Sequence, residues 1–344
     1  MPRCWECIGT RKRIIYIILA LAPILAIILS LFIGRYPVSL SDIGQVILTR
    51  LHLANYEVAK VNSVLIWDIR LPRAILGAMV GACLAVSGAA FQGLFRNPLV
   101  SSGILGVSSG AGFGAALAII LFHGNTSATY IFAFGFALLA VFLSYMIGQV
   151  YNTTPTIMLV LGGVIVSSVF SSLISFTKYV ADPFQELPSI VFWLMGSLAS
   201  ADYQDIMVAG VPMLAGVIGL LGIRWRINVL SMGDKEAHTL GVNLKLDKAI
   251  VILAATLATA GAVCVSGIIG WVGLIIPHIS RMLVGNDNRL LIPSSMALGA
   301  CFLVLVDDVG RVITGSEIPL GILTALIGAP FFVWLLKKTK GGGW

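Results

Sequence analysis

Long apolar runs that carry no charged side chain restrict this chain more than any other feature of its sequence. One run covers residues 206–223, and another begins at residue 249 and continues up to Arg281. About 20 consecutive apolar residues suffice for a helix to cross the ~30 Å hydrocarbon core of a bilayer. Only 11% of the 344 residues are charged, whereas soluble domains have roughly 25%. The chain is therefore expected to be an integral membrane protein.

The apolar runs predict an all-α, polytopic protein with about ten transmembrane helices. The expected spans are residues 14–33, 74–94, 99–122, 128–150, 157–179, 203–223, 249–267, 271–283, 290–310 and 319–336. A shorter apolar piece at 190–198 follows the fifth span. The first run is longer than the apolar core of a signal peptide, which has about 7–15 residues. We therefore expect it to remain as a membrane helix.

An even number of spans places both termini on the same side of the membrane. Most of the 22 Lys and Arg residues then fall on that side, and basic residues are enriched in cytoplasmic loops. We therefore expect a single membrane domain over residues 14–337, a cytoplasmic N-terminal tail over residues 1–13, and a cytoplasmic C-terminus.

A polar segment at residues 224–248 separates the sixth and seventh spans. Its 25 residues include eight charged side chains, so it is expected to lie in water on the cytoplasmic side. Ser231 or Gly233 would start a short helix over residues 234–240, and Gly241 would end it. Composition leaves two interpretations open: a folded loop that a partner holds, and a solvated connector.

Two stretches of the sequence resemble each other and indicate an internal repeat. VGACLAVSG at residues 80–88 is similar to AGAVCVSG at residues 260–267. The copies lie five spans apart, so they would run in opposite directions across the membrane. Inverted repeats of this kind are common in transporters, where the substrate path follows the interface between the halves.

Several motifs of enzymes are absent or out of context. The sequence has no GxxxxGK[ST] P-loop, so the chain itself is not expected to hydrolyse ATP. GVSSG at residues 106–110 matches the GxSxG nucleophile motif, but it lies in a predicted membrane span, so we interpret it as helix packing. The four His residues are too dispersed to argue a metal site. Cys4 and Cys7 form a lone CxxC whose role stays open.

Few charged side chains fall within the predicted spans. Asp307 and Asp308 either relay protons or bind a cation, or they sit at the membrane–water interface, where one pairs with Arg311; the second interpretation is favoured. Arg70, Arg73 and Arg311 lie on the outer side, where they either reach lipid headgroups or dock an acidic partner. Arg73 would also lie at the positive end of the second span, where a cation is unfavourable.

Five motifs, in order along the chain, resemble the FecCD family. They are RLPR at 70–73, SGAAFQGLFRNPL at 87–99, LGVSSGAG at 105–112, GWVGLIIPH at 270–278 and EIPLG at 317–321. Members of this family are permease subunits of ABC importers for vitamin B12, iron-siderophores and heme. The resemblance covers about residues 14–337.

The resemblance implies a fold, partners and a location. The fold would be that of the vitamin B12 permeases, with two inverted five-helix halves in the cytoplasmic (inner) membrane. The partners would be a second permease copy, two cytoplasmic ATPase subunits that bind ATP and Mg²⁺, and a periplasmic or surface-anchored substrate-binding protein. The chain itself would need no cofactor, catalyse no reaction and bind no nucleic acid.

The resemblance also assigns roles to residues by their position in the motifs. Docking of the binding protein would use Arg70, Arg73 and Arg311. Coupling to the ATPase would use Gly233, Asp234, Glu236, Ala237, Leu240 and Gly241. The cytoplasmic gate would use Asn97, Leu99 and Thr156.

The implied function is the transport of a metal chelate, which would be a ferric siderophore, heme or cobalamin. Three alternatives stay open. The chain would be a permease of the same type for molybdate or another oxyanion, an ion-coupled secondary transporter, or an intramembrane hydrolase that depends on Ser108. No sequence feature selects the substrate.

Overall fold

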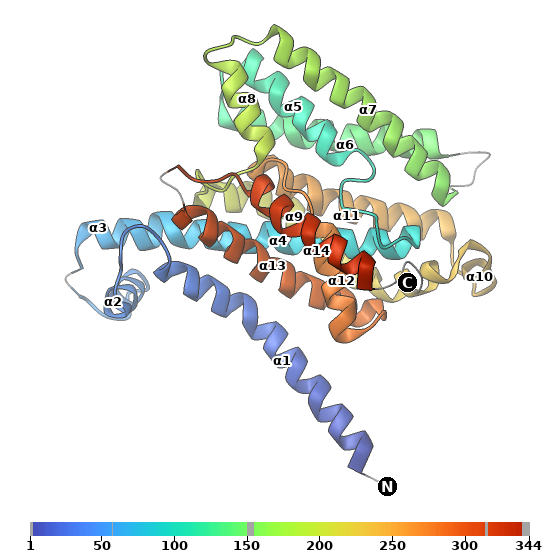
Figure 1. The fold of residues 1–344 in the computed structure, drawn as a ribbon, viewed down its shortest axis with the longest axis horizontal. Helices are drawn as coiled ribbons and strands as arrows, with labels where there is room; N and C mark the ends of the chain where they lie inside the picture. The colour runs from blue at the N-terminus through green and yellow to red at the C-terminus, as the bar shows by residue number, and fades with distance from the viewer. Residues whose placement is uncertain (1–2, 57, 150–154, 314–315, 339–344) are drawn as a thin grey trace.

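The computed structural model describes residues 3–56, 58–149, 155–313 and 316–338, and every regular element within those ranges is helical (Figure 1). The elements are α1 (Arg3–Phe32), α2 (Leu40–Arg50), α3 (Lys60–Ser63), the π-helix η1 (Val64–Arg70), α4 (Leu71–Phe95), α5 (Val107–Leu121), α6 (Thr126–Gly148), α7 (Thr156–Val180), α8 (Glu186–Met195), α9 (Tyr203–Met232), α10 (Asp234–Thr239), α11 (Leu244–Ser266), α12 (Val272–Val284), α13 (Asn288–Ile313) and α14 (Leu320–Lys338). The all-α prediction is confirmed.

Each of the ten predicted spans overlaps one of these helices. Within the described residues, six helices are long and apolar enough to cross a membrane: Lys60–Phe95, Thr126–Gly148, Thr156–Val180, Tyr203–Met232, Leu244–Ser266 and Asn288–Ile313. The shorter apolar helices are Ile17–Phe32, Val107–Leu121, Glu186–Met195, Val272–Val284 and Leu320–Leu335. The chain is thus a multi-pass membrane protein, and the count of ten spans stays a prediction.

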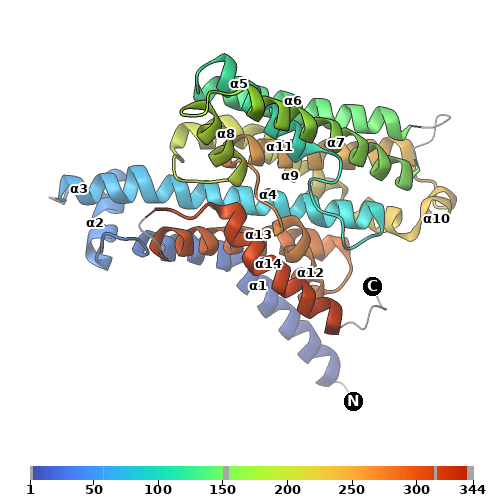
Figure 2. The same ribbon diagram turned by 45° about the horizontal axis from the view of Figure 1, so that its top comes forward.

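Helix α4 forms the centre of the bundle (Figures 1 and 2). Helices α9, α11, α12 and α13 all pack against it. Helices α5–α8 lie on one side of α4, and α1, α13 and α14 lie on the other side. The start of α1, the end of α14 and the short helix α10 all lie toward the same end of the bundle.

Glycines let α4 approach its neighbours more closely than larger residues would. A Cβ atom at Gly88 would lie 2.6 Å from the carbonyl carbon of Gly273, and one at Gly81 would lie 2.8 Å from the carbonyl carbon of Gly299. Small residues at such crossings increase van der Waals contact between helices in lipid, where no hydrophobic effect holds helices together.

The two copies of the sequence repeat lie on helices that pack against each other. The first copy lies on α4, and α11 carries the second. Helix α4 runs toward the end of the bundle that carries α10, whereas α11 starts at that end (Figure 1). Just beyond each copy, the side-chain amide of Gln92 donates to the backbone oxygens of Val100 and Gly273 at 3.1 and 3.3 Å. The opposite directions of the copies agree with an inverted repeat.

We expect Gly88→Ala to lower the free energy of unfolding by about 1–3 kcal/mol, the usual effect of overpacking a tight core. The methyl group would meet the rigid backbone of Gly273, which has no side chain to move away. Gly135→Ala is the matched control, because Gly135 lies within α6 with no atom near its Cβ position. The control should leave stability unchanged or raise it, since Ala favours helix. Unfolding of both variants in detergent measures the difference, and equal stabilities would contradict the close contact.

The second span begins earlier than the sequence predicts. Helix runs without a break over Lys60–Phe95, so Arg73 lies inside it and not at the positive end of a helix. Pro72 has no N–H and would clash with a carbonyl oxygen one turn earlier. The preceding segment η1 is π-helical, and the N–H of Leu71 donates to the carbonyl oxygen of Ile66, five residues earlier. This wider turn lets the helix continue through the proline.

Candidate functional site

Arg73 lies at the centre of a buried ion-pair network, which we call the arginine network. Its Nε and Nη2 atoms donate to the two carboxylate oxygens of Asp307 on α13 at 2.8 and 2.7 Å. Its Nη1 atom donates to Glu317, before α14, at 2.9 Å. Only 6% of Arg73 is exposed. A two-point contact between guanidinium and carboxylate is strong and directional, so Arg73 fixes α4 against α13.

Arg311 extends the network to α1. Its Nη2 atom donates to the carboxylate of Asp308 and, at 2.7 Å, to the hydroxyl oxygen of Ser30. The Ser30 hydroxyl in turn donates to Asp308 at 2.6 Å. The Nε atom of Arg311 also lies 3.4 Å from a carboxylate oxygen of Asp307.

Arg70 is also buried near this end of α1, and its hydrogen bonds go to backbone oxygens. Its Nη1 and Nη2 atoms donate to the carbonyl oxygens of Leu31 and Tyr36, both at 2.6 Å. Leu31 is in the last turn of α1, where carbonyl groups lack partners within the helix, and Tyr36 lies just beyond that helix. Arg70 therefore fixes the chain where α1 ends.

The predicted pairing of one aspartate with Arg311 is confirmed, since Arg311 pairs with both Asp307 and Asp308. Both carboxylates are buried inside the protein, where Ser30 and Arg73 contact them. Their place at the membrane–water interface stays a prediction. The docking role of the three arginines stays a prediction. It requires them to exchange partners of this chain for acidic groups of another protein.

The polar segment between α9 and α11 is shorter than its charges suggest. Helix α9 continues through Arg224 and Arg226 to Met232, and α11 begins at Leu244. A helix satisfies its backbone hydrogen bonds in water as well as in lipid, so it need not end where the apolar run ends. Residues 233–243 remain between the two helices, and we call them the coupling segment.

The coupling segment contains the predicted short helix. Helix α10 covers Asp234–Thr239, and Gly233 precedes it with φ 127°. Gly241 follows it with φ 76°, a conformation that favours glycine. The start at Gly233 is confirmed, and the alternative start at Ser231 is wrong because Ser231 lies within α9.

One ion pair fixes the coupling segment to α11, and a second joins α9 to α11 beside it. The Nζ atom of Lys248 lies 2.8 Å from a carboxylate oxygen of Asp234, and Arg226 pairs with Asp247 at 2.6 Å. Lys248 and Asp247 are buried, whereas their partners are about half exposed. Exposed charges alone stabilise little, but burial of Lys248 in its pair with Asp234 makes the position of α10 more definite.

If a partner held α10 through its small residue, Ala237 would have to be exposed, and it is not. Ala237 is fully buried against this chain itself. Glu236 and Leu240 are exposed, and Leu240 has 59% of its surface accessible. Any partner would therefore contact the Leu240 side of the segment.

The predicted gate residues lie on two separate elements. Asn97 and Leu99 follow the C-terminal end of α4, where the side-chain oxygen of Asn97 accepts from the N–H of Leu99 at 2.9 Å. Leu99 is half exposed. Thr156 begins α7 and is partly buried. Their role as a gate stays a prediction.

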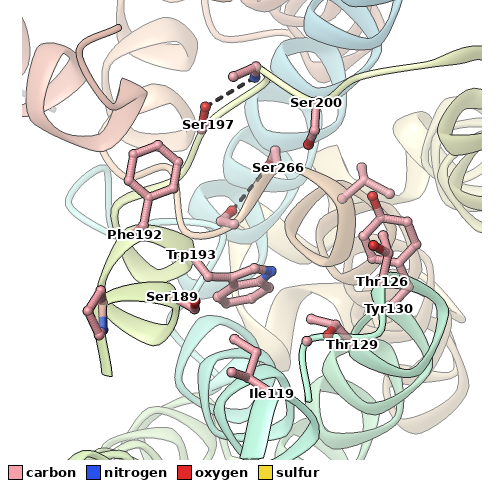
Figure 3. Close-up of a pocket in the computed structure, with 15 residues that line it drawn as sticks. Ile119, Thr126, Thr129, Tyr130, Ser189, Phe192, Trp193, Ser197, Ser200 and Ser266 are labelled. Carbon is pink, nitrogen blue, oxygen red and sulfur yellow. Dashed lines mark hydrogen bonds between the residues drawn. The ribbon is translucent and has the colours of Figure 1, made fainter. Parts of the chain in front are cut away.

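A cavity of about 620 Å³ lies between α6, α8 and the end of α11 (Figure 3). Its lining contains seven hydroxyl groups and no charged side chain: Thr126, Thr129, Tyr130, Ser189, Ser197, Ser200 and Ser266. Trp193 and Phe192 supply apolar surface from α8. The sequence does not reveal this site, because its hydroxyl groups lie near helix ends that are far apart along the chain.

Several of these hydroxyl hydrogens are already used within the chain. Tyr130 donates to a carboxylate oxygen of Asp205 at 2.8 Å, and Ser189 donates to the carbonyl oxygen of Gln185 at 2.7 Å. Ser266 donates to the carbonyl oxygen of Ala262 at 2.9 Å. A hydroxyl that donates still has lone pairs with which to accept. The cavity therefore suits a neutral ligand that carries hydrogen-bond donors. Across the described residues, no group of three His, Cys, Asp or Glu side chains is arranged to hold a metal ion.

Comparison with known proteins assigns the chain to a family. Residues 21–338 match the FecCD transport family. The molybdate import system permease protein MolB of Haemophilus influenzae is 43% identical over 328 residues, which cover 94% of this chain and 96% of the relative. A probable iron chelatin transport system permease protein of Helicobacter pylori is 40% identical over 324 residues, covering 94% of this chain and 98% of the relative.

A solved structure shows the same fold. It is described as an inward-facing conformation of a putative metal-chelate type ABC transporter, and it matches with a TM-score of 0.82 and 40% sequence identity. The match covers 93% of this chain and 97% of that chain. Together with the family match over nearly the whole sequence, this similarity means that the chain belongs to the FecCD transport family.

Proposed function

We propose that this chain is the membrane-spanning permease subunit of an ABC importer in the cytoplasmic membrane, with both termini and the coupling segment in the cytoplasm. The observation that carries the proposal is the full-length similarity to permeases. It is joined with a short helix that pairs with the buried Lys248 of α11 and that exposes the apolar side chain of Leu240 nearby. A separate ATPase would bind there. A conformational change follows ATP binding only if the ATPase has different affinities for the two states of the permease.

The proposed assembly has two permease copies, two ATPase subunits and an external substrate-binding protein. The sequence has no P-loop with which to bind ATP phosphates itself. ATP and Mg²⁺ would therefore be bound by the partner. The binding protein would deliver substrate to the end of the bundle opposite α10, where the arginine network lies.

We propose a metal chelate as the substrate, which is the substrate type of the iron chelatin relative and of the similar ABC transporter. Molybdate is the second candidate, favoured by the 43% identity with MolB over 94% of the chain. The two classes differ in size and charge, so direct uptake assays separate them.

The purified chain should show no ATP turnover by itself. With its ATPase it should copurify in a two-to-two complex and take up substrate into vesicles in an ATP-dependent manner. Vesicles that hold the complete importer should be given labelled molybdate, ferric siderophore, heme and cobalamin in parallel. Uptake by vesicles without any ATPase would contradict the proposed function and favour a secondary transporter.

A further inference from the structure

A second cavity, of about 420 Å³, lies between the C-terminal end of α4, helix α12 and the start of α13. Three basic side chains line it, Arg96, His278 and Arg281, together with neutral residues that include Gln92 and Asn97. No Asp or Glu side chain belongs to this lining. The cavity is at the end of the bundle that carries the coupling segment, and we call it the basic cavity.

Arg281 lacks a carboxylate partner among the ion pairs of the described residues. Its recorded hydrogen bond goes from Nη2 to the neutral side-chain oxygen of Gln92 at 2.5 Å. Its Nη1 atom is buried and makes no hydrogen bond. The amide of Gln92 is held by backbone oxygens, so Gln92 is fixed with its oxygen toward Arg281. Arg281 is partly buried, and a guanidinium nitrogen shielded from water without a counter-charge is unfavourable; an anion nearby removes that cost.

Arg96 is the second cation of the basic cavity. It follows the last residue of α4 with φ 51°, in the left-handed region where glycine is usual. No ion pair of Arg96 is recorded within the described residues. The helix dipole already stabilises a cation at the C-terminal end of α4. The missing counter-charge therefore indicates an anion more strongly at Arg281 than at Arg96.

Two acidic residues lie near the basic cavity, Asp287 and Glu236, and neither forms an ion pair with Arg281. The side-chain oxygen of Asp287 accepts from the amide of Asn228 at 2.7 Å and from the N–H of Arg289 at 3.0 Å. The backbone N–H of Arg289 and the amide of Asn228 lower the pKa of Asp287, so it stays ionised and satisfied there. Glu236 approaches Gly233, close to Arg96. Neither acid contributes to the lining, so the positive charge of Arg281 stays uncompensated in the cavity.

We propose that the basic cavity binds a tetrahedral oxyanion of the phosphate type, with Arg281 as its main cation and Arg96 and the side-chain amide of Asn97 as further donors. Arg suits such ligands because its planar group can donate two parallel hydrogen bonds to oxygen atoms. The same chemistry is present in a free inorganic oxyanion and in the headgroup of an anionic phospholipid.

The test is thermal unfolding of the purified, delipidated full chain in neutral detergent, titrated with inorganic phosphate at constant ionic strength. The unfolding temperature of the wild type should rise and saturate, because a ligand that binds only the folded state stabilises it. Arg281→Gln should weaken the apparent affinity by about tenfold or more, as expected when a charged hydrogen-bond donor is lost. Arg289→Gln removes the same charge next to the cavity but outside its lining, so it should respond like the wild type.

A second arm distinguishes the two sources of the oxyanion. The chain is placed in nanodiscs of phosphatidylcholine alone or with phosphatidylglycerol. If a lipid headgroup occupies the basic cavity, phosphatidylglycerol should stabilise the wild type but not Arg281→Gln, and free phosphate should add little. If the ligand is a free oxyanion, phosphate should stabilise the wild type equally in both lipid mixtures.

Arg96→Gln keeps the proposal testable if Arg281→Gln fails to fold, because Arg96 lies at the end of α4 and not in the core. It should weaken the phosphate response several-fold. A wild type that responds to phosphate and to phosphatidylglycerol no more than to chloride would overturn the proposal. The same conclusion would follow if both the Arg281→Gln and Arg96→Gln variants responded like the wild type.

Discussion

Replacing Arg73 with Gln should lower the free energy of unfolding by about 3–5 kcal/mol, the usual effect of removing one partner from a buried ion pair. The carboxylate of Asp307 would stay buried and lose both of its hydrogen bonds from Arg73. The nitrogen of Arg311 at 3.4 Å would be its nearest remaining cation. Unfolding of the purified chain in detergent, followed by denaturant or heat, measures the loss.

Two controls separate this effect from a general loss of charge. Arg50→Gln removes a cation from a pair with Asp68 whose side chains are both nearly half exposed, so stability should change by less than about 1 kcal/mol. The double variant Arg73→Met with Asp307→Leu should recover much of the lost stability, because apolar residues of similar volume often replace a buried ion pair without cost. An Arg73→Gln chain as stable as the wild type would show that the pair contributes nothing to folding.

The same variant bears on docking of the external binding protein. If Arg73 exchanges Asp307 for an acidic group of that protein, Arg73→Gln should weaken docking as well as folding. If Arg73 is structural only, the folded fraction of the variant should bind its carrier as tightly as the wild type at every salt concentration. Measuring affinity on protein that remains folded therefore separates the two roles.

The helices could be predicted from the sequence because the rule that produces them is local. Within a bilayer every backbone N–H and C=O must find a partner inside the segment, so an uncharged run of sufficient length becomes a helix. The end of α10 was equally local, because Gly241 adopts a conformation with positive φ that glycine favours. Family motifs then supplied the fold, which the similar structure confirms.

The contacts of the charged residues could not be predicted, because they join parts of the chain that are far apart. Ser30 and Asp308 are separated by 278 residues, and Arg73 and Asp307 by 234. No periodicity within a single helix reveals such a pair. The sequence also placed Arg73 at the positive end of the second span. The π-helical turn before Pro72 instead extends the helix back to Lys60, so Arg73 lies within it.

The coupling segment shows how burial changes a prediction. If Ala237 packed into a groove on the ATPase, a larger residue at this position would overfill that groove. Ala237 is fully buried against this chain, so such a residue would first displace α10 itself. The exposed apolar side chains around α10 are Met232, Leu240 and Leu246, each more than half accessible. A partner surface has to cover these side chains instead.

Leu240→Asp should therefore release the ATPase. A side chain that is a hot spot of an interface contributes about 2 kcal/mol or more to binding, or roughly a 30-fold change in affinity, and Leu240 is expected to be one because it is the most exposed apolar side chain next to α10. A carboxylate at this position would also lose hydration on binding without gaining a partner. Copurification of the ATPase and ATP-dependent uptake by reconstituted vesicles should both fall strongly, while the unfolding temperature of the chain alone stays unchanged.

Lys235→Ala provides the matched control, because Lys235 is an exposed residue of the same helix with no recorded ion pair in the described part of the chain. It should leave copurification and uptake near wild-type values. Gly241→Val should act through the backbone, since a β-branched residue at φ 76° is strained although its Cβ position is open. Normal coupling in both Leu240→Asp and Gly241→Val would mean that residues 233–243 are a solvated connector, and the ATPase would then have to bind another surface at this end of the bundle.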